Sequence, residues 1–333
     1  MSKNRRIILG IETSCDDTGL GIICDGKKVL SNIVSSQINI HKEFGGVVPE
    51  LASRSHLEVI YAEITKALEE ANLTLNDINA VAVTYGPGLV GCLLTGIEVA
   101  KSISYVRNIP LIGVNHLEGH VFSSFLENPK IKFPFIGLIV SGGHTELVKV
   151  NDFGHYEILG KTRDDACGEA FDKIAKLLGL GYPGGPYIEK LAKDSKKSYK
   201  FPEAIMKDGS LDFSFSGLKT AVLNFLQENK NVRQNDLCAG FQNAAISALL
   251  NKTIDVAKKL DIKRIVLGGG VIVNKALKKE FKERGEKEEM DIYYPSPIFC
   301  TDNGVMIALI GYYKFLRNEF SDWTLNANPA LTL

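Results

Sequence analysis

One order of strands and turns occurs twice along this sequence of 333 residues, and it limits the folds that the chain can adopt. Residues 6–30 predict an apolar strand, a polar turn, a second strand, an Asp-Gly hairpin and a third strand. Residues 133–160 predict the same order, with a turn of small and polar residues and an N-D-F-G hairpin. An internal duplication explains the repetition, so we expect two similar α/β domains.

Helical regions and further strands complete both halves of the duplication. A helical region follows at residues 55–72 in the first half and at residues 165–178 in the second. A buried-looking strand comes later in each half, at residues 80–85 and at residues 264–270. We therefore expect a βββαβα order in each domain.

The domain boundary is expected near residues 127–134, where the sequence E-N-P-K interrupts the pattern. The chain is long enough to bury two cores, because single domains usually contain about 100–200 residues. We predict a first domain of residues 1–130 and a second domain of residues 131–300. A last helix, near residues 302–318, is expected to pack back onto the first domain.

The charge balance and the cysteines exclude several classes of protein. Lys plus Arg and Asp plus Glu both number 39, so no overall positive field favours nucleic acid. Lys-rich stretches at residues 190–200 and 275–289 either contact a phosphate backbone or are simply solvated faces. The six cysteines include no C-x-x-C, which argues against a disulfide framework and a zinc ribbon.

No apolar run reaches the roughly 20 residues of a membrane helix. The apolar run after the basic first residues meets Glu12 too early for the core of a signal peptide. We therefore expect a cytoplasmic protein without a membrane partner, with an organellar matrix as the alternative location.

The stretch N-H-L-E-G-H, residues 115–120, contains two histidines four positions apart. On a helix, His116 and His120 lie one turn apart on the same face, a spacing at which two imidazoles can bind a divalent metal. Surface or capping histidines are the alternative. The metalloprotease signature H-E-x-x-H needs a Glu directly after the first histidine, where this chain has Leu117. Glu118 projects elsewhere, so the pattern does not favour a protease.

Asp302 is the candidate for the third ligand that such a metal site requires. It lies in I-F-C-T-D-N-G-V-M, residues 298–306, which predicts the end of a strand, a polar turn and the start of a helix. An Asp at a helix start either binds a metal or caps the helix.

A group of carboxylates follows the first predicted strand. The sequence E-T-S-C-D-D-T places Glu12, Asp16 and Asp17 close together at the strand end. Such a group can hold a metal, water or phosphate, or supply a base; ordinary turn chemistry is the alternative.

Two glycine-rich turns, S-G-G-H-T at residues 141–145 and G-G-G-V at residues 268–271, let backbone N–H groups approach phosphate oxygens. A helix is predicted from Asp165 to Gly179, before a Gly/Pro loop, with Glu169 and Asp172 on one face. Those acids either bind ribose hydroxyls or belong to a solvated face. The duplicated architecture resembles that of sugar kinases, actin and the heat-shock ATPases, in which a nucleotide lies in the cleft between the two halves.

Nine motifs, in order from about residue 7 to residue 310, carry a more specific resemblance. The chain resembles the universal tRNA N6-adenosine threonylcarbamoyltransferase family, and most closely its bacterial form, formerly described as a glycoprotease (O-sialoglycoprotein endopeptidase). The motifs are G-I-E-T-S-C-D-D-T, H-K-E-F-G-G-V-V-P-E-L-A-S-R-S-H, Y-G-P-G-L, N-H-L-E-G-H, V-S-G-G-H-T, G-E-A-F-D-K, Y-P-G-G-P, F-S-F-S-G-L-K-T and C-T-D-N-G-V-M.

The resemblance implies an acyltransferase that moves a threonylcarbamoyl group from threonylcarbamoyl-AMP to N6 of adenosine 37 in tRNAs reading ANN codons. By motif position, His116, His120 and Asp302 match the family's ligands for one divalent ion per subunit, expected to be Fe²⁺, with Zn²⁺ or Mg²⁺ as alternatives. The residues implied to bind the donor are Ile139, Val140, Ser141, Gly142 and Gly143, with Asp172 and Gly185 at its adenosine part and Asn274 from the other side.

Motif position also suggests which groups accept the proton that the attacking amine loses. Asp16 and His144 are the two candidates. The family usually has D-E-T where this chain has D-D-T, so the shorter side chain of Asp17 changes the reach of that carboxylate. The sequence S-G-G-H-T is typical of bacterial and organellar members, whereas archaeal and eukaryotic cytosolic relatives have S-G-G-N-T.

Bacterial relatives work with a paralogous actin-like protein and a small P-loop ATPase, so the resemblance implies both as partners, in addition to tRNA. The helical region Ser53–Leu73 has an apolar stripe that serves either the core or such a pseudo-symmetric dimer. Three other functions are compatible with parts of the pattern: a small-molecule kinase or ATPase of the same architecture, a metal-dependent protease, and a nonenzymatic nucleotide-switched binding module.

Overall fold

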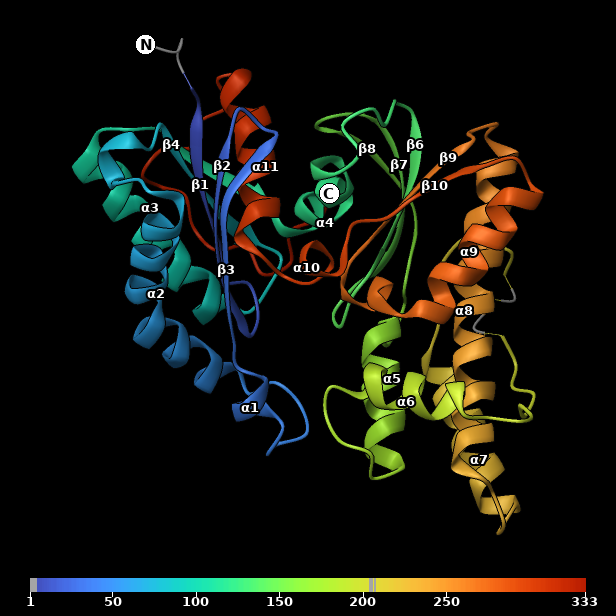
Figure 1. Ribbon diagram of the computed structural model, residues 1–333. Coiled ribbons are helices and arrows are strands. Elements are labelled where there is room, and N and C mark those ends of the chain that lie inside the picture. The colour runs from blue at the N-terminus through green and yellow to red at the C-terminus, as the bar shows by residue number, and fades with distance from the viewer. Residues whose placement is uncertain (1–4, 204–205, 207) are drawn as a thin grey trace. The chain divides into compact units, whose positions relative to one another are not determined.

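The computed structural model describes residues 5–203, 206 and 208–333 of the chain (Figure 1). The chain divides into two compact units. Unit 1 consists of Met1–Ile131 together with Pro295–Leu333, and unit 2 consists of Lys132–Tyr294.

Unit 1 is built on a five-stranded sheet with the strand order β3-β2-β1-β4-β5. The first three strands pair antiparallel, whereas β1, β4 and β5 run parallel. Its strands are β1 (Ile7–Glu12), β2 (Asp17–Cys24), β3 (Lys28–Ser36), β4 (Ala80–Gly86) and β5 (Leu111–Asn115). Its helices are α1 (Ile38–His41), α2 (Pro49–Ala71), α3 (Val90–Arg107), α4 (His116–Phe122), α10 (Pro297–Cys300) and α11 (Gly304–Leu316), with 3-10 turns at Leu75–Asp77 and Ser123–Leu126.

Unit 2 repeats this plan with the strand order β10-β9-β6-β7-β8. Its strands are β6 (Phe135–Val140), β7 (Thr145–Asp152), β8 (His155–Lys161), β9 (Arg264–Gly268) and β10 (Asp291–Tyr293). Its helices are α5 (Cys167–Leu177), α6 (Gly184–Lys193), α7 (Ser216–Glu228), α8 (Gln234–Lys259) and α9 (Lys275–Lys287), with a 3-10 turn at Gly270–Val273.

The two sheets confirm the duplicated α/β fold. In each unit the first strand is central: it pairs antiparallel with the second strand and parallel with the fourth. Both strands expected late in the repeats are present, as β4 and β9. The parallel strands require helical crossovers, which α2 supplies between β3 and β4 in unit 1.

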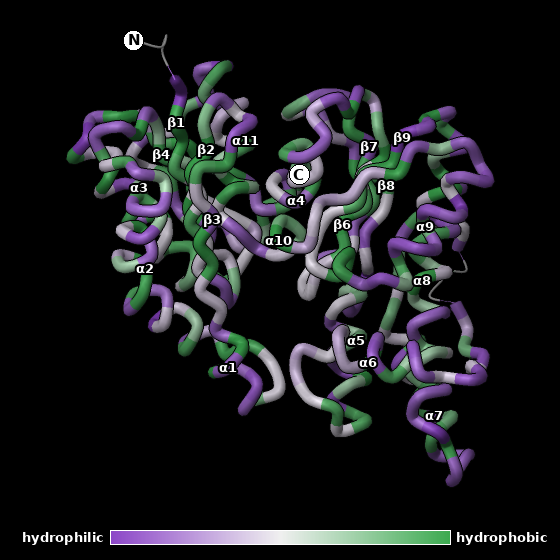
Figure 2. The backbone as a smooth tube through the Cα atoms, viewed as in Figure 1, coloured by the Kyte–Doolittle hydropathy of each residue, from purple (hydrophilic) through white to green (hydrophobic). Residues whose placement is uncertain are grey.

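The predicted helix at residues 55–72 begins six residues earlier, at Pro49. Proline is favoured in the first helical turn, because its missing N–H has no intrahelical partner there. The helix ends at Asn72, which adopts the left-handed conformation with φ of 53°. The apolar stripe of α2 enters the core through Ile60, Ile64 and Ala67, and Figure 2 shows the resulting alternation of apolar and polar residues along the helix.

The expectation that residues 298–300 end a strand is wrong. They belong to the short helix α10, which begins at Pro297. The strand that precedes them, β10, ends at Tyr293. Proline at the first helical position favours a helical turn over the strand that the β-branched and aromatic residues suggested.

Helix α11 lies directly on the backbone of the unit 1 sheet. A Cβ atom added at Gly10 of β1 would overlap the carbonyl oxygen of Gly304, and one at Gly21 of β2 would overlap the amide nitrogen of Val305. Glycine on the strands therefore permits a closer approach than any larger residue allows. A Cβ at Gly19 of β2 would also overlap the backbone of Asn303, so the close packing extends to the residue that follows Asp302.

The described helices include none that is both long enough and apolar enough to span a bilayer. The length of α2 is sufficient, but charged residues interrupt its apolar stripe.

Candidate metal centre and substrate-binding residues

Helix α4 carries both histidines of the N-H-L-E-G-H motif and starts directly after β5. Asn115 caps the helix, since its side-chain oxygen accepts a hydrogen bond of 2.8 Å from the amide of Leu117. The imidazole rings of His116 and His120 lie 4.6 Å apart between centroids. All seven residues of α4 are buried, so the predicted helical spacing is realised in a site largely shielded from solvent.

Asp302 lies beside both histidines. Its Oδ1 atom is 3.1 Å from Nε2 of His120 and 3.6 Å from Nε2 of His116. One ligand atom from each of the three residues lies within 4.8 Å of the other two. The helix N-cap of α11 is the neighbouring Asn303, which accepts a hydrogen bond from the amide of Met306. The capping alternative therefore applies to Asn303, and the carboxylate of Asp302 faces the histidines.

These three residues fit a divalent metal ion. Ligand atoms bound at about 2.0–2.2 Å lie about 3–3.5 Å from one another, close to the Asp302–histidine distances of 3.1 and 3.6 Å. His120 is fully buried, and among the described residues neither of its ring nitrogens makes a hydrogen bond. Its Nε2 lies 3.1 Å from the Asp302 carboxylate without forming a hydrogen bond. Burying an imidazole in this state is unfavourable, and a metal ion held by both groups would satisfy them.

Two polar groups contact Nδ1 of His116, the ring nitrogen that does not face Asp302. Its Nδ1 atom lies 3.0 Å from Oε2 of Glu12 and 3.1 Å from Oγ of Ser14. Glu12 is fully buried and also accepts hydrogen bonds from the amide of Ser14 and the hydroxyl of Thr84, both at 2.6 Å. Metal-binding histidines commonly direct their second nitrogen to a carboxylate, which fixes the orientation of the ring. This arrangement leaves Nε2 of His116 to face Asp302.

The charges around His116 favour a cation. Burial lowers the pKa of His116, but the nearby carboxylates of Glu12 and Asp302 outweigh it and raise the pKa to about 9. Burial alone would raise the pKa of Glu12, but the charge and hydrogen bond of His116 hold it below its usual value. The same negative potential that attracts a proton attracts a divalent ion.

Glu118 is directed away from the metal ligands. Its Oε2 atom forms an ion pair of 3.1 Å with Nζ of Lys314 on α11. Lys314 also donates a hydrogen bond to the carbonyl oxygen of Gly113. Glu118 is thus engaged with α11, and Leu117 occupies the position of the general base in an H-E-x-x-H protease helix.

Comparison with known proteins identifies the family. Residues 28–309 match the family described as TsaD: tRNA N6-adenosine threonylcarbamoyltransferase. A protein of that name from Clostridium perfringens strain SM101 is 50% identical over 335 aligned residues, which cover 99% of each chain. Another, from Caldicellulosiruptor saccharolyticus, is 50% identical and covers 98% of each chain. The chain belongs to the TsaD family. The predicted enzyme class, a threonylcarbamoyltransferase acting on tRNA, is thereby confirmed.

Solved structures of low sequence identity support the fold of this TsaD chain. Component A of (R)-2-hydroxyglutaryl-CoA dehydratase from Acidaminococcus fermentans superimposes with a TM-score of 0.57 at 17% identity, over 93% of this chain and 98% of that one. Full-length HypF superimposes with a TM-score of 0.65 at 16% identity, over 95% of this chain and 56% of that one. These likenesses concern the fold, and they agree with the duplicated actin-like architecture.

The acidic turn of the TsaD chain lies near the candidate metal ligands in unit 1. Burial raises the pKa of Asp16, and the charge of Asp302 raises it further. Burial and the charge of Asp302 also raise the pKa of Asp17, to about 7. His56 supports the turn: its Nδ1 lies 2.7 Å from the hydroxyl of Thr18, and its Nε2 lies 2.9 Å from the carbonyl oxygen of Cys15.

In unit 2, the S-G-G-H-T motif forms the predicted turn between β6 and β7. The hydroxyl of Ser141 accepts a hydrogen bond of 3.0 Å from the amide of His144, and the amide of Ser141 donates to the carbonyl of His144 at 2.8 Å. Gly142 and Gly143 are exposed and have open space where a Cβ would lie. Their amides are therefore accessible to a phosphate or carbonyl oxygen.

Ile139 and Val140 differ from the three residues that follow them. Both side chains are fully buried in the β6 strand. A ligand would reach these two residues through their backbone, and their predicted place beside the donor stays a prediction.

Asp172 of α5 contacts the start of α6, whose second residue is Gly185. The Oδ1 atom of Asp172 accepts a hydrogen bond of 2.6 Å from the amide of Gly184. Gly185 is in the first turn of α6, where an added Cβ would meet no neighbour. Glu169, on the same face of α5, pairs with Lys173 at 2.9 Å, so it belongs to the solvated surface.

Asn274 is buried and makes two structural hydrogen bonds. Its oxygen caps α9 by accepting from the amide of Leu277 at 3.0 Å, and its side-chain nitrogen donates to Gln242 at 2.8 Å. A donor molecule would have to replace the bond to Gln242 or use the backbone of Asn274. The capping role follows from the sequence N-K-A-L, since Asn is a favoured N-cap residue.

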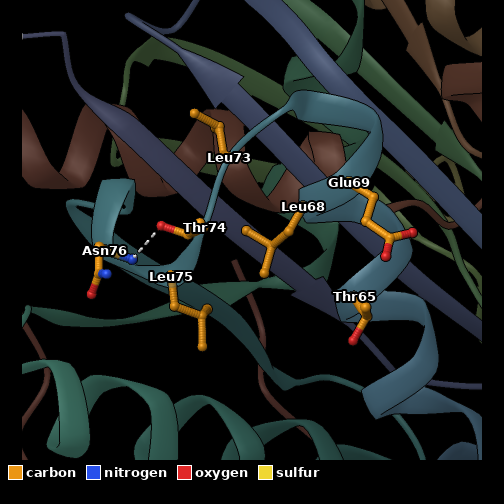
Figure 3. Close-up of a pocket in the computed structure, with 7 residues that line it drawn as sticks. All are labelled: Thr65, Leu68, Glu69, Leu73, Thr74, Leu75 and Asn76. Carbon is orange, nitrogen blue, oxygen red and sulfur yellow. Dashed lines mark hydrogen bonds between the residues drawn. The ribbon is translucent and has the colours of Figure 1, made fainter.

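A shallow hollow lies elsewhere in unit 1, at the end of α2 (Figure 3). It is lined by Thr65, Leu68, Glu69 and residues 73–76. Thr74 contributes a capping hydroxyl to the 3-10 turn there. None of the metal or turn residues described above lines it, so it is not part of the candidate site.

The sequence did not assign three polar residues around His116 to the site: Glu12 and Ser14, which contact its Nδ1, and Asn115, which caps its helix. Glu12 was recognised only as one of three crowded acids, and Ser14 and Asn115 were not singled out. The sheet topology could have indicated the role of Glu12. The carboxyl ends of the parallel strands β1, β4 and β5 lie on the same side of the sheet, so Glu12 at the end of β1 comes close to His116, which follows β5.

Proposed function

We propose that this chain transfers a threonylcarbamoyl group from threonylcarbamoyl-AMP to N6 of adenosine 37 in tRNAs that read ANN codons, with a divalent metal ion held by His116, His120 and Asp302. The observation that carries the metal assignment is the meeting of ligand atoms from His116, His120 and Asp302 within 4.8 Å of one another, where neither ring nitrogen of the buried His120 makes a hydrogen bond to the described residues. Membership of the TsaD family over the whole chain supports the reaction.

The ligand set favours a transition metal. Two imidazoles and one carboxylate suit Fe²⁺ or Zn²⁺, whereas Mg²⁺ prefers ligands that are all oxygen. We therefore propose one ion per subunit, Fe²⁺ first and Zn²⁺ second. When bound, the ion would supply Lewis-acid polarisation and a template for the phosphate and carbamoyl oxygens of the donor.

The transfer requires a group that takes up a proton. The N6 amine forms a bond to the carbamoyl carbon, the bond from that carbon to the phosphate oxygen breaks, AMP leaves, and the amine loses a proton. We propose Asp16 or His144 as the acceptor. The raised pKa of Asp16, which results first from burial, makes its carboxylate a stronger base than an exposed one.

Donor binding is proposed to use backbone groups of unit 2. The amides of Ser141, Gly142 and Gly143 would approach the acyl phosphate, where Gly142 and Gly143 leave room. The start of α6, at Gly184 and Gly185, would approach the adenosine part beside Asp172. A variant that adds a Cβ, Gly143→Ala, tests the backbone contact, because it should raise the KM for the donor without lowering stability.

A paralogous actin-like protein and a small P-loop ATPase are proposed as partners. A face of unit 1 suits the first of them: Leu57 and Tyr61 of α2 and Val90 and Leu94 of α3 are exposed, and α2 packs against α3. Exposed apolar groups on adjacent helices are typical of interaction surfaces. Tyr61→Glu should abolish co-purification with the paralogue, whereas Val106→Glu, an equally exposed position near the far end of α3, should not. The proposed location is the bacterial cytoplasm.

The deciding experiment is nucleoside mass spectrometry of tRNA from cells that lack the gene. Complementation with wild type should restore threonylcarbamoyladenosine, and the double variant His116→Ala, His120→Ala should not. If the modification persists without the gene, and no second copy supplies it, the transferase function is wrong. Restoration by the double variant would instead contradict only the metal site.

A further inference from the structure

The chain after α11 runs back across unit 1 as a strap of residues 321–333. Its first half pairs with the start of the edge strand β5: the amide of Ser321 donates to the carbonyl of Leu111 at 2.8 Å, and its hydroxyl accepts from the amide of Gly113 at 2.9 Å. Leu325 packs against the hydrophobic core of unit 1. This half covers an otherwise open sheet edge, which is a structural role.

The second half of the strap, residues 326–333, contacts the turn that follows β4. The pairing of β4 with β5 skips Tyr85, so the β5 strand leaves this residue unpaired. The strap pairs with it instead: the amide of Asn328 donates to the carbonyl of Tyr85 at 2.8 Å, and the carbonyl of Pro329 accepts from the amide of Gly88 at 3.3 Å. A Cβ at Gly86 would overlap the carbonyl of Asn328, so the two segments are in close contact.

This turn leads directly to His116. The amide of Leu89, next to Gly88, donates to the carbonyl of Ser14 at 2.8 Å. The hydroxyl of Ser14 lies 3.1 Å from Nδ1 of His116. The turn 85–89 thus connects the strap to Ser14, whose hydroxyl contacts the ring of His116.

A second connection reaches the same histidine. The side-chain nitrogen of Asn115 donates to the carbonyl of Thr332 at 3.0 Å, while its oxygen caps α4. Asn115 is 6% exposed, so a lost partner for its nitrogen would not be freely replaced by water. Since α4 begins at His116, the strap holds the cap of the helix that carries both histidines.

We propose that residues 326–333 act as a positioning segment for the metal site, holding Asn115 and the turn 85–89 so that His116 and His120 face Asp302. The inference rests on the metal binding proposed above. Groups that hydrogen-bond directly to metal ligands typically contribute about 10–100-fold to metal affinity. The strap acts one contact further out, through Ser14 and Asn115, so its loss should weaken binding toward the lower end of that range, whereas a segment that only covers the sheet edge would change stability alone.

Titration with Co²⁺ alone, followed by its d–d absorption, tests the proposal together with thermal unfolding. A variant lacking residues 326–333 retains Leu325 and should bind Co²⁺ about tenfold or more weakly, with an altered spectrum. Asn115→Ser keeps a good helix cap but loses the bond to Thr332, and it should weaken Co²⁺ in the same direction. Ser321→Ala, in the first half of the strap, should lower the melting temperature while leaving Co²⁺ affinity unchanged.

The outcomes are separable. If the wild type binds Co²⁺ and both the deletion and Asn115→Ser bind it equally well, the strap has only a covering role and the inference is overturned. If the deletion does not fold, Asn115→Ser decides alone. Failure of the wild type itself to bind Co²⁺ would overturn the proposed metal site, and the role of the strap with it.

Discussion

The Nδ1 atom of His116 lies 3.0 Å from Oε2 of Glu12, a fully buried carboxylate. Glu12 is itself held by the amide of Ser14 and the hydroxyl of Thr84. The carboxylate therefore cannot rotate away from the ring without losing two further hydrogen bonds, and the ring keeps Nε2 directed at Asp302. The orientation of His116 in the candidate metal site therefore depends on Glu12, which is not one of the three candidate ligands.

Replacing that carboxylate should weaken metal binding. Glu12→Gln keeps the size of the side chain but removes its negative charge, so we expect metal affinity to fall about 10–100-fold. Isothermal titration with Zn²⁺ measures this loss. Glu70→Gln removes the same charge at an exposed position of α2 and should bind Zn²⁺ like the wild type. Equal affinities for the two variants would contradict the orienting role of Glu12.

Metal should stabilise unit 1 through the histidines. A ligand present at 100 times its dissociation constant stabilises the folded state by about 2.7 kcal/mol, so Zn²⁺ should raise the melting temperature of the wild type. His120→Ala should abolish the rise, because Nε2 of His120 lies 3.1 Å from Asp302 at the centre of the ligand set. The same scan on His155→Ala, at the exposed start of β8, is the control. A rise that survives in His120→Ala would place the ion elsewhere.

Much of this site could be predicted from the sequence, because its ligands follow local rules. The four-residue spacing of His116 and His120 acts within one helix, and the polar turn at Asp302 is visible before α11. The role of Glu12 could not be predicted, since it depends on β1, β4 and β5 being neighbours in the sheet, which local patterns do not specify. The side chain of Asn274 caps α9, a role that the sequence N-K-A-L also indicates; its role in donor binding stays a prediction.

Glycine at Gly10 should be essential for the packing of α11. A Cβ there would overlap the backbone of Gly304, which cannot rotate away as a side chain can. We expect Gly10→Ala to lower the free energy of unfolding by about 1–3 kcal/mol or more, measured by urea denaturation. In Gly217→Ala the new methyl meets no neighbour, and the exchange lies inside α7, so it should be neutral or slightly stabilising. A neutral Gly10→Ala would mean that α11 can move away from the sheet.

Asp164 should make the stability of unit 2 depend on pH. Its carboxylate accepts hydrogen bonds from the hydroxyls of Ser214 and Ser216 and from the amides of Phe215 and Ser216. Burial opposes the charge, but these hydrogen bonds outweigh it and lower the pKa of Asp164 below its ordinary value of 3.8. Because the folded state binds the proton less readily than the unfolded state, the stabilisation is present above pH 3.8 and is lost as the pH falls below it.

The variant Asp164→Asn isolates this contribution. An amide can accept at one oxygen only, so at neutral pH we expect a loss of about 1–3 kcal/mol in the free energy of unfolding. Urea denaturation at pH 7 and near pH 3.5 should show the difference from wild type shrinking at the lower pH. Asp255→Asn, whose carboxylate is exposed on α8, should differ little from wild type at either pH. A difference between wild type and Asp164→Asn that stays constant with pH would show that the side chain acts by shape and not by charge.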